Sequence, residues 1–180
     1  MKNLFLTLLA TLALTNCSND NNEPPSNPAD QLPPATTIGA NKVGCLVNGE
    51  VFLPKGSNLF GAPILTCSYQ YVDNGFEFGL GFSNNVILSR GITILTNKLE
   101  FAEGNTYMLK QELNINSAYA YYDVGLMYFG TNSIKTGELK ITKLDQTNAI
   151  ISGTFWYDAI NAAGTVVQIR DGRFDMRYSQ

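Results

Sequence analysis

The sequence predicts an all-β protein, either an antiparallel β-sandwich or an open β-barrel of about ten strands. Three observations predict this fold class. Apolar and polar residues alternate with a period of two in many segments, short turns rich in Gly, Asn and Asp separate those segments, and no window keeps helical periodicity. With 180 residues and 44% hydrophobic content, the chain is expected to hold a single globular domain.

The first 16 residues have the features of an export signal. Lys2 precedes an apolar run from Leu4 to Leu14, which is shorter than the roughly 20 residues that a membrane-spanning helix needs. The following Leu14-Thr15-Asn16-Cys17 resembles a bacterial lipobox, although Asn16 stands where a small residue is usual. The resemblance implies that residues 1–16 are a lipoprotein signal peptide and that Cys17 is lipidated, with acyl chains that attach the protein to a membrane. The alternative is an ordinary signal peptide with a chance cysteine.

Residues 17–38 are expected to form a flexible tether. This stretch is rich in Asn and contains five of the seven prolines of the chain, so it has too little apolar surface to fold by itself. Asp20 and Glu23 give it a weak resemblance to the surface-export signal of lipoproteins from Bacteroidota. We therefore expect an outer-membrane protein, lipid-anchored and facing either the periplasm or the cell surface.

The single all-β domain is expected over residues 39–180. Asn48-Gly49 predicts a first hairpin, and Asp73-Asn74-Gly75 predicts a second. After that second turn, four apolar residues alternate strictly with small or polar ones, which predicts a strand with one buried face; the apolar residues are Phe76, Phe78, Leu80 and Phe82, and the others are Glu77, Gly79 and Gly81. The next strand is expected over Val86–Thr96, with a bulge at Arg90-Gly91.

Residues 137–178 predict a meander of four strands. Gly137–Asp145, Ala149–Asp158 and Thr165–Arg170 form the first three, and Asp171-Gly172 predicts a tight hairpin into the last. The last strand places its apolar side chains on one face and its charged side chains on the other; these are Phe174, Met176 and Tyr178 against Arg173, Asp175 and Arg177. Arg170, Arg173 and Arg177 could form an anion site, but Asp171 and Asp175 lie among them, so we expect cross-strand pairing of these charges instead.

Cys45 and Cys67 are predicted to form a disulfide. With Cys17 lipidated, they are the remaining even pair in an exported domain, and the bond would contribute roughly 3 kcal/mol. The alternative is two buried free thiols that pack as small hydrophobic residues. We expect no metal site, because two thiolates without any His need two further ligands.

Several short motifs resemble a family of small Bacteroidota lipoproteins known as a domain of unknown function. The motifs are Gly39-Ala40-Asn41, Gly44-Cys45 and Val47-Asn48-Gly49 near the start, and Gly137-Glu138-Leu139, Ile151-Ser152-Gly153-Thr154-Phe155 and Asp171-Gly172-Arg173-Phe174 near the end. The resemblance implies a single domain from Gly39 onward. It implies no activity and no catalytic residues.

The composition argues against nucleic-acid binding and against catalysis that depends on histidine. The formal charge of −3 gives no basic surplus for nucleic acid, and the absence of His removes the commonest general base. We expect a non-enzymatic binding module without a cofactor, its ligand a glycan or an envelope protein. The alternatives are a structural or assembly accessory of an outer-membrane complex and, less favoured, a hydrolase using Glu77, Asp123 or Asp175, whose spacing predicts no catalytic pair.

A ligand face is predicted on one long strand over Tyr119–Phe129. Its even positions from Ala120 to Tyr128 are almost all apolar and are expected to face the core. Tyr119, Tyr121 and Asp123 then face outward, with the two tyrosines about 7 Å apart, close to the spacing for stacking along a sugar chain. The alternative is that these tyrosines simply pair across strands and bind nothing.

Overall fold

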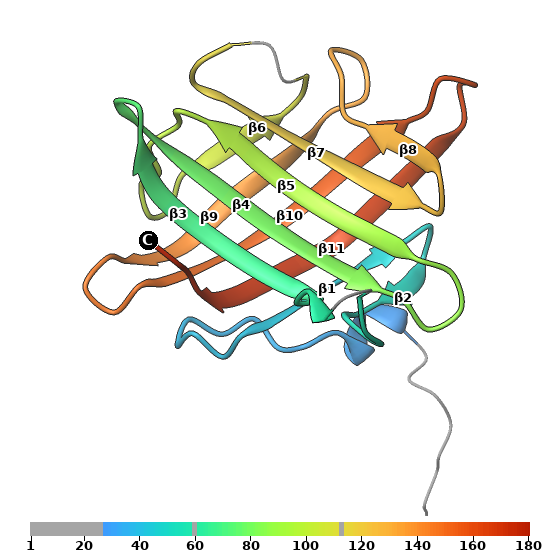
Figure 1. Ribbon diagram of the computed structural model, residues 1–180, viewed down its shortest axis with the longest axis horizontal. Helices are drawn as coiled ribbons and strands as arrows, with labels where there is room; N and C mark the ends of the chain where they lie inside the picture. Colours follow the sequence, from blue (N-terminus) through green and yellow to red (C-terminus); the bar gives the residue numbers. More distant parts are fainter. Residues whose placement is uncertain (1–26, 59–60, 112–113) are drawn as a thin grey trace, which may run out of the picture.

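The computed structural model describes residues 27–58, 61–111 and 114–180 (Figure 1). The predicted signal peptide, Cys17 and the first part of the predicted tether lie outside the described residues.

Eleven strands form one sheet, in the order β2-β1-β11-β10-β9-β6-β7-β5-β4-β3, and β8 pairs with both β7 and β10. Nearly all neighbours are antiparallel, and the exception is the short parallel pairing of β6 with β7. The strands are β1 (Lys42–Val47), β2 (Glu50–Phe52), β3 (Leu65–Val72), β4 (Gly75–Asn84), β5 (Arg90–Asn97), β6 (Thr106–Leu109), β7 (Ser117–Val124), β8 (Met127–Gly130), β9 (Gly137–Asp145), β10 (Ile150–Ile160) and β11 (Val166–Arg177).

The sheet folds over on itself into two layers. In Figure 1, β3, β4, β5 and β7 form the front layer, and β9, β10 and β11 cross behind them. The two ends of the sheet approach each other at isolated bridges that join Ser68 to Ser179 and Lys55 to Asn84. The all-β prediction is confirmed, and the architecture is that of a sandwich or open barrel.

The space between the layers is filled by the predicted apolar faces. Phe78, Leu80 and Phe82 of β4 point inward and are buried, whereas Gly79 and Gly81 lie on the outer face. On β11 the side chains of Phe174 and Met176 are buried in the same core, as the alternation predicted. Burial of these large side chains is the main source of stability, at about 1.5–3 kcal/mol for each.

The two predicted early hairpins are present. Asn48 and Gly49 adopt positive φ values of 50° and 85° between β1 and β2. Asp73 and Asn74 do the same between β3 and β4, with φ values of 46° and 68°. Positive φ at both central residues is the geometry whose twist matches a two-residue hairpin, and Asn, Asp and Gly adopt it at the lowest cost.

Asp171-Gly172 is a bulge and not the predicted hairpin. β11 runs continuously through both residues, and its register against β1 and β10 slips by one residue at this point. Asp171 has a φ of 53°, which accommodates the extra residue. Gly172 is required because a Cβ atom here would lie 2.4 Å from the Phe155 ring. The C-terminal block therefore has three long strands rather than four.

Two further strand predictions were too long. The pairing of β4 with β5 ends at Asn84 and Arg90, so residues 85–89 form a loop instead of the start of a strand. The predicted strand over Tyr119–Phe129 is broken by a turn at Gly125, which has a φ of 58°. The turn reverses the chain, so that Phe129 is buried while Leu126 and Tyr128 are exposed, contrary to the predicted parity.

Cys45 and Cys67 are free thiols, so the disulfide prediction was wrong. Cys45 lies on β1 and Cys67 on β3, which are far apart in the strand order, and each is buried in the hydrophobic core. Burial raises the pKa of the Cys45 thiol far above its usual range and raises that of Cys67 to about 12. The two residues pack as small apolar side chains, which was the alternative left open by the sequence.

Part of the predicted tether packs against the sheet. A 3-10 helix, η1 (Pro28–Gln31), is followed by Leu32, whose side chain is buried, and Arg173 of β11 donates a hydrogen bond to the Ala29 carbonyl at 3.1 Å. Prolines favour the extended conformation that lies along a strand, and the outer face of β11 supplies the contacts that the segment lacks by itself. Residues 27–38, which the sequence assigned to the tether, therefore pack against the domain predicted to begin at Gly39.

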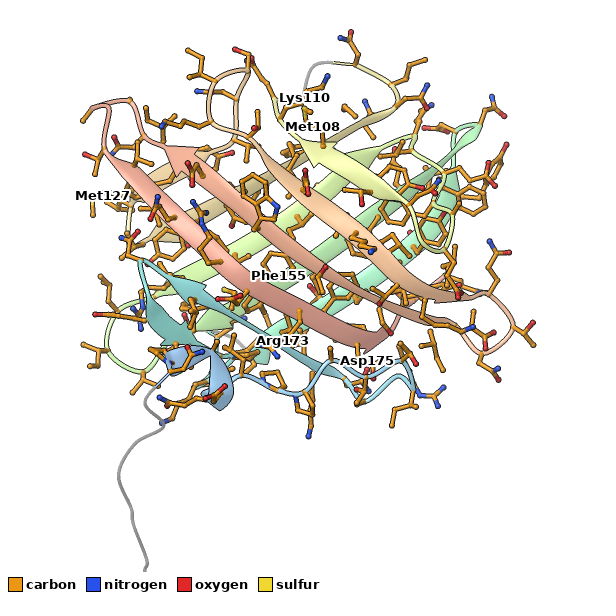
Figure 2. All side chains as sticks on the ribbon, turned by 180° about the vertical axis from the view of Figure 1, so that it is seen from behind. Met108, Lys110, Met127, Phe155, Arg173 and Asp175 are labelled. Atoms are coloured by element: carbon orange, nitrogen blue, oxygen red, sulfur yellow. The ribbon has the colours of Figure 1, made fainter. Side chains whose placement is uncertain are left out.

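Hydrogen bonds to the Asp175 carboxylate hold residues 36–40 against β11. Its carboxylate accepts hydrogen bonds from the backbone N–H groups of Ile38, Gly39 and Ala40 at 3.1, 2.7 and 3.1 Å. It also accepts hydrogen bonds from the hydroxyl groups of Thr36 at 2.6 Å and Ser152 at 2.8 Å. Figure 2 places Arg173 and Asp175 on β11 beside the blue N-terminal segment. The carboxylate is thus a structural anchor for residues 36–40.

Candidate functional site

The outer face of the front layer carries a floor of glycines. Gly79 and Gly81 lie on β4, and Gly91 of the neighbouring strand β5 pairs with Ser83, two residues beyond Gly81. Because these residues have no side chains, the surface is hollowed at two neighbouring places with volumes of about 360 and 240 Å³. We call this surface the glycine-floored face.

The walls of the glycine-floored face are mainly polar. The first hollow is lined by side chains that include Gln70, Glu77, Asn97 and Tyr119. The second is lined by side chains that include Thr66, Ser83, Thr93 and Asp123. The hydroxyl groups of Ser68 and Thr66 lie 3.0 Å from where a Cβ of Gly79 or Gly81 would stand, so side chains at either position would fill the floor. Hydroxyl, amide and carboxylate groups around a shallow floor suit a ligand rich in hydroxyl groups.

Asp123 is the most unusual group on this face. Its carboxylate leans over Gly91, where an added Cβ would lie only 2.6 Å from Oδ1. Within the described parts of the chain, no hydrogen bond or salt bridge reaches this half-buried carboxylate, and burial raises its pKa. A carboxylate that is partly removed from water and lacks a protein donor is available to accept hydrogen bonds from a ligand.

Aromatic rings flank Asp123. Tyr121 precedes it on the same face of β7, and Tyr128 pairs with Asp123 across β7 and β8. The two rings lie with centroids 5.1 Å apart at an angle of 36°. Tyr128 is 56% exposed. The cluster therefore offers ring surface next to a carboxylate, the combination that binds both the apolar and the hydroxyl-bearing faces of a sugar.

The three predicted site residues lie on the outer face of β7, but they do not gather in one hollow. Ala120 and Tyr122 are buried, so the parity predicted for this part of the strand is correct. Tyr119 lines the first hollow and Asp123 the second, with Tyr121 beside Tyr128. The glycines were missed as site residues, although the strict alternation of Gly79 and Gly81 with buried apolar residues was a usable signal.

The carboxylates named as hydrolase candidates do not meet. Asp123 is level with Ser83 across the β5 and β4 ladders, and Ser83 lies about 20 Å along β4 from Glu77 at about 3.4 Å per residue. Paired carboxylates in glycosidases stand at most about 10 Å apart. Asp175 lies in the other layer, where five donors from its own chain occupy it.

A family comparison places much of this face inside a known domain. Residues 84–176, just over half of the chain, match the model of a domain of unknown function, DUF6252. The chain belongs to the DUF6252 family. The DUF6252 match begins at the last residue of β4 and ends in β11, so it contains Gly91 and all of β7 but not Gly79 or Gly81. No curated protein and no solved structure matches the chain.

On the opposite face of the DUF6252 domain, side chains of β10 and β11 line a further hollow of about 650 Å³. Trp156 lines it and is covered on one side by the Arg170 guanidinium, whose carbon lies 5.5 Å from the ring centroid. Arg170 forms a salt bridge with Asp158 at 2.5 Å, and Trp156 donates a hydrogen bond to Glu138 at 3.3 Å. Arg170 and Trp156, the two large side chains of this hollow, are thus each paired with a neighbouring carboxylate.

The three arginines near the C-terminus, Arg170, Arg173 and Arg177, each interact with a different group. Arg170 forms a cross-strand salt bridge, as predicted, but its partner is Asp158 and not Asp171 or Asp175. Arg173 donates to the Ala29 carbonyl, and Arg177 donates to the Asn148 carbonyl. Each guanidinium thus has its own protein acceptor, and the three do not form an anion site.

Metal-ligating side chains and long apolar helices are both limited in the described residues. No group of three or more His, Cys, Asp or Glu side chains is arranged there to hold a metal ion. Across the same residues, no helix has the length and apolar character that crossing a membrane requires.

Proposed function

We propose that this protein is a lipid-anchored envelope protein whose DUF6252 domain is a non-enzymatic module that binds a glycan on the glycine-floored face. The observation that carries the proposal is the Asp123 carboxylate, half-buried beside Tyr121 and Tyr128 and without a donor from the described chain. Sugar hydroxyl groups would supply the missing donors, and the tyrosine rings would contact the apolar face of a sugar ring.

The geometry of the hollows agrees with this ligand class. They are shallow and open to solvent, which suits a chain that lies across a sheet rather than a small molecule enclosed in a cavity. The glycines keep the floor low enough for a ring to approach the β4 and β5 backbones. Membrane attachment is supported by the lipobox resemblance at Cys17 and by the apolar run before it.

The proposal is tested by screening the protein against a glycan array and then measuring the affinity of three variants for the best ligand. Asp123→Asn removes the charge, and Gly91→Ala keeps the charge but displaces the carboxylate, so each should weaken binding by about tenfold or more. Asp171→Asn is the matched control, because Asp171 is an exposed carboxylate on the other layer.

The expected result is loss of affinity in the first two variants and none in the third. A glycan bound equally well by all three folded proteins would contradict the proposed face. If the array gives no ligand and a pull-down from envelope extracts instead recovers one protein in fixed ratio, the alternative of a structural accessory to an outer-membrane complex is favoured.

A further inference from the structure

Exposed apolar side chains gather on two neighbouring loops. The loop between β4 and β5 presents Val86, Ile87 and Leu88. The turn between β7 and β8 presents Leu126, which is followed by the exposed Met127 at the start of β8. Ile87 is 98% exposed and Leu126 is fully exposed. Isolated exposed apolar residues are ordinary, but a cluster of five such residues is typical of a surface that contacts a membrane or another protein. We call these five residues the apolar tip.

Backbone contacts hold the two loops of the apolar tip next to each other. The Gly125 N–H donates to the Ser89 carbonyl at 2.8 Å, and Arg90 pairs with Val124, so the two loops are joined by backbone contacts. Behind the tip lies a hollow of about 560 Å³, and the two charged residues that line it, Lys55 and Arg90, are both cations. The arrangement is an apolar projection with two cations in the hollow at its base, and the Asp123 carboxylate lies nearby on the outer face of β7.

The tip lies at the end of the molecule where the described chain begins. Leu32 and Pro33 pack beside Gly44 together with Leu53, and the Leu53 carbonyl accepts a hydrogen bond from Asn84, next to the tip loop, at 3.2 Å. In Figure 1 the blue helix η1, where the described chain begins, lies at the lower right, and the β4–β5 loop and the β7–β8 turn lie on the right side above it. The opposite end of β7 carries Ile115 in the preceding loop.

From this placement we infer that the apolar tip inserts into the surface of the lipid bilayer and orients the domain on the membrane. The inference rests on the proposed lipid anchor but not on the proposed glycan site. The chain from Cys17 to Asn27 spans at most about 35 Å, so an anchored Cys17 keeps this end of the domain near the bilayer. Apolar side chains would enter the interfacial region while Lys55 and Arg90 meet the headgroups, which favours anionic lipids.

Tryptophan placed in the tip tests the inference, because bromine atoms on lipid acyl chains quench tryptophan fluorescence only at short range. The full, lipidated protein with Trp156→Phe is reconstituted into vesicles of phosphatidylcholine with about a quarter phosphatidylglycerol. Ile87→Trp and Leu126→Trp are two independent probes of the tip. Ile115→Trp is the matched control, exposed by 65% at the far end of β7, about 25 Å away along the strand.

Insertion predicts that bromine near the top of the acyl chain quenches both tip variants by roughly half or more and the Ile115→Trp variant by roughly a tenth or less. Vesicle-bound protein in which all three variants are quenched equally little would overturn the inference and leave the anchor intact. If the fluorescence of the tip tryptophans is not quenched but changes with protein concentration, the tip contacts a second copy of the protein, and the inference of membrane insertion would also be overturned. Protein that fails to float with vesicles would overturn both the anchor and the insertion.

Discussion

At the scale of single residues, two aspartates on outer strand faces have pKa values that are shifted in opposite directions. Burial by itself raises the pKa of Asp123 and of Asp175. For Asp175, hydrogen bonds from Thr36, Ser152, Gly39 and Ala40 outweigh that effect, and its pKa falls to about 2. Asp123 has no such donors, and its pKa stays raised. The first carboxylate is satisfied by the fold, and the second is left for a ligand.

Asp123→Asn is expected to stabilise the protein slightly while it weakens glycan binding. A carboxylate whose pKa is raised on folding destabilises the native state once the pH exceeds its unfolded pKa of about 3.9. Removing the charge at pH 7 should therefore raise the free energy of unfolding, by less than about 1 kcal/mol because the group is partly exposed. Urea unfolding at pH 7 measures the change. A clear loss of stability would show that the carboxylate has a structural partner.

Cys45 and Cys67 are expected to be unreactive in the native protein and free after unfolding. A thiolate-specific reagent should label neither residue at pH 8, because burial raises both thiol pKa values well above that pH. Unfolding without a reductant should expose both to alkylation, detected by mass spectrometry of the two peptides. A covalently linked peptide pair from unreduced protein would contradict the structure.

At the scale of elements, the alternation of residues predicts faces well and strand ends poorly. The inward and outward residues of β4, β11 and the first part of β7 follow the sequence. The break at Gly125 and the loop over 85–89 do not, since apolar residues continue through both. A strand ends where its neighbour stops pairing, and that neighbour is distant in the sequence. The Asp171-Gly172 bulge also depends on a neighbouring strand. Only glycine fits at position 172, because the Phe155 ring of β10 occupies the place of a Cβ atom there.

The N-terminal segment over residues 27–40 is expected to detach when Asp175 is replaced. Asp175→Asn substitutes amide hydrogens for one acceptor oxygen and leaves donors of residues 36–40 unpaired, at a cost of about 2–4 kcal/mol. Hydrogen exchange of peptides over residues 27–40 should rise in this variant. Asp171→Asn, on the same strand but exposed, should leave the exchange unchanged.

The same carboxylate gives the fold an acid sensitivity with a defined direction. Because the pKa of Asp175 is lowered on folding to about 2, its contribution is fully present above about pH 4 and is lost as the pH falls toward 2. Urea unfolding between pH 5 and 2 should show this loss in the unsubstituted protein. The Asp175→Asn variant should lack that part of the slope, and parallel pH curves for the two proteins would contradict the assignment.

At the scale of the whole molecule, the two layers set apart three surfaces. The glycine-floored face lies on the front layer, the N-terminal segment lies along β11 of the back layer, and the apolar tip lies at one end. With the tip on the bilayer, the strands of the front layer would rise away from it. The first hollow of the glycine-floored face would then lie far from the headgroups, and the second hollow, lined by Ser89 and Asp123, would lie close to them.

The proposed anchor predicts the location of the whole molecule. Cys17→Ser should move the protein from the membrane fraction to the soluble fraction, or leave its signal unprocessed, because no acyl chain can be attached. Fractionation and the mass of the mature chain measure both results. A substituted protein that matures normally and stays in the membrane would contradict the lipid anchor, whatever the domain binds.

The sequence by itself determined the all-β class, the two early hairpins and the faces of most strands. These depend on local chemistry: alternation sets which side is apolar, and Asn, Asp and Gly adopt the positive φ that tight turns need. The outward direction of Tyr119, Tyr121 and Asp123 follows from the same alternation.

Only the tertiary structure decided which distant residues meet. Cys45 and Cys67 share a core without sharing a bond, Asp175 lies under residues 36–40, and Gly91 lies under the Asp123 carboxylate. Each outcome depends on the order of strands in the sheet. That order is set by the burial of one common core, in which residues far apart in the chain contribute together, so no local pattern of residues encodes it.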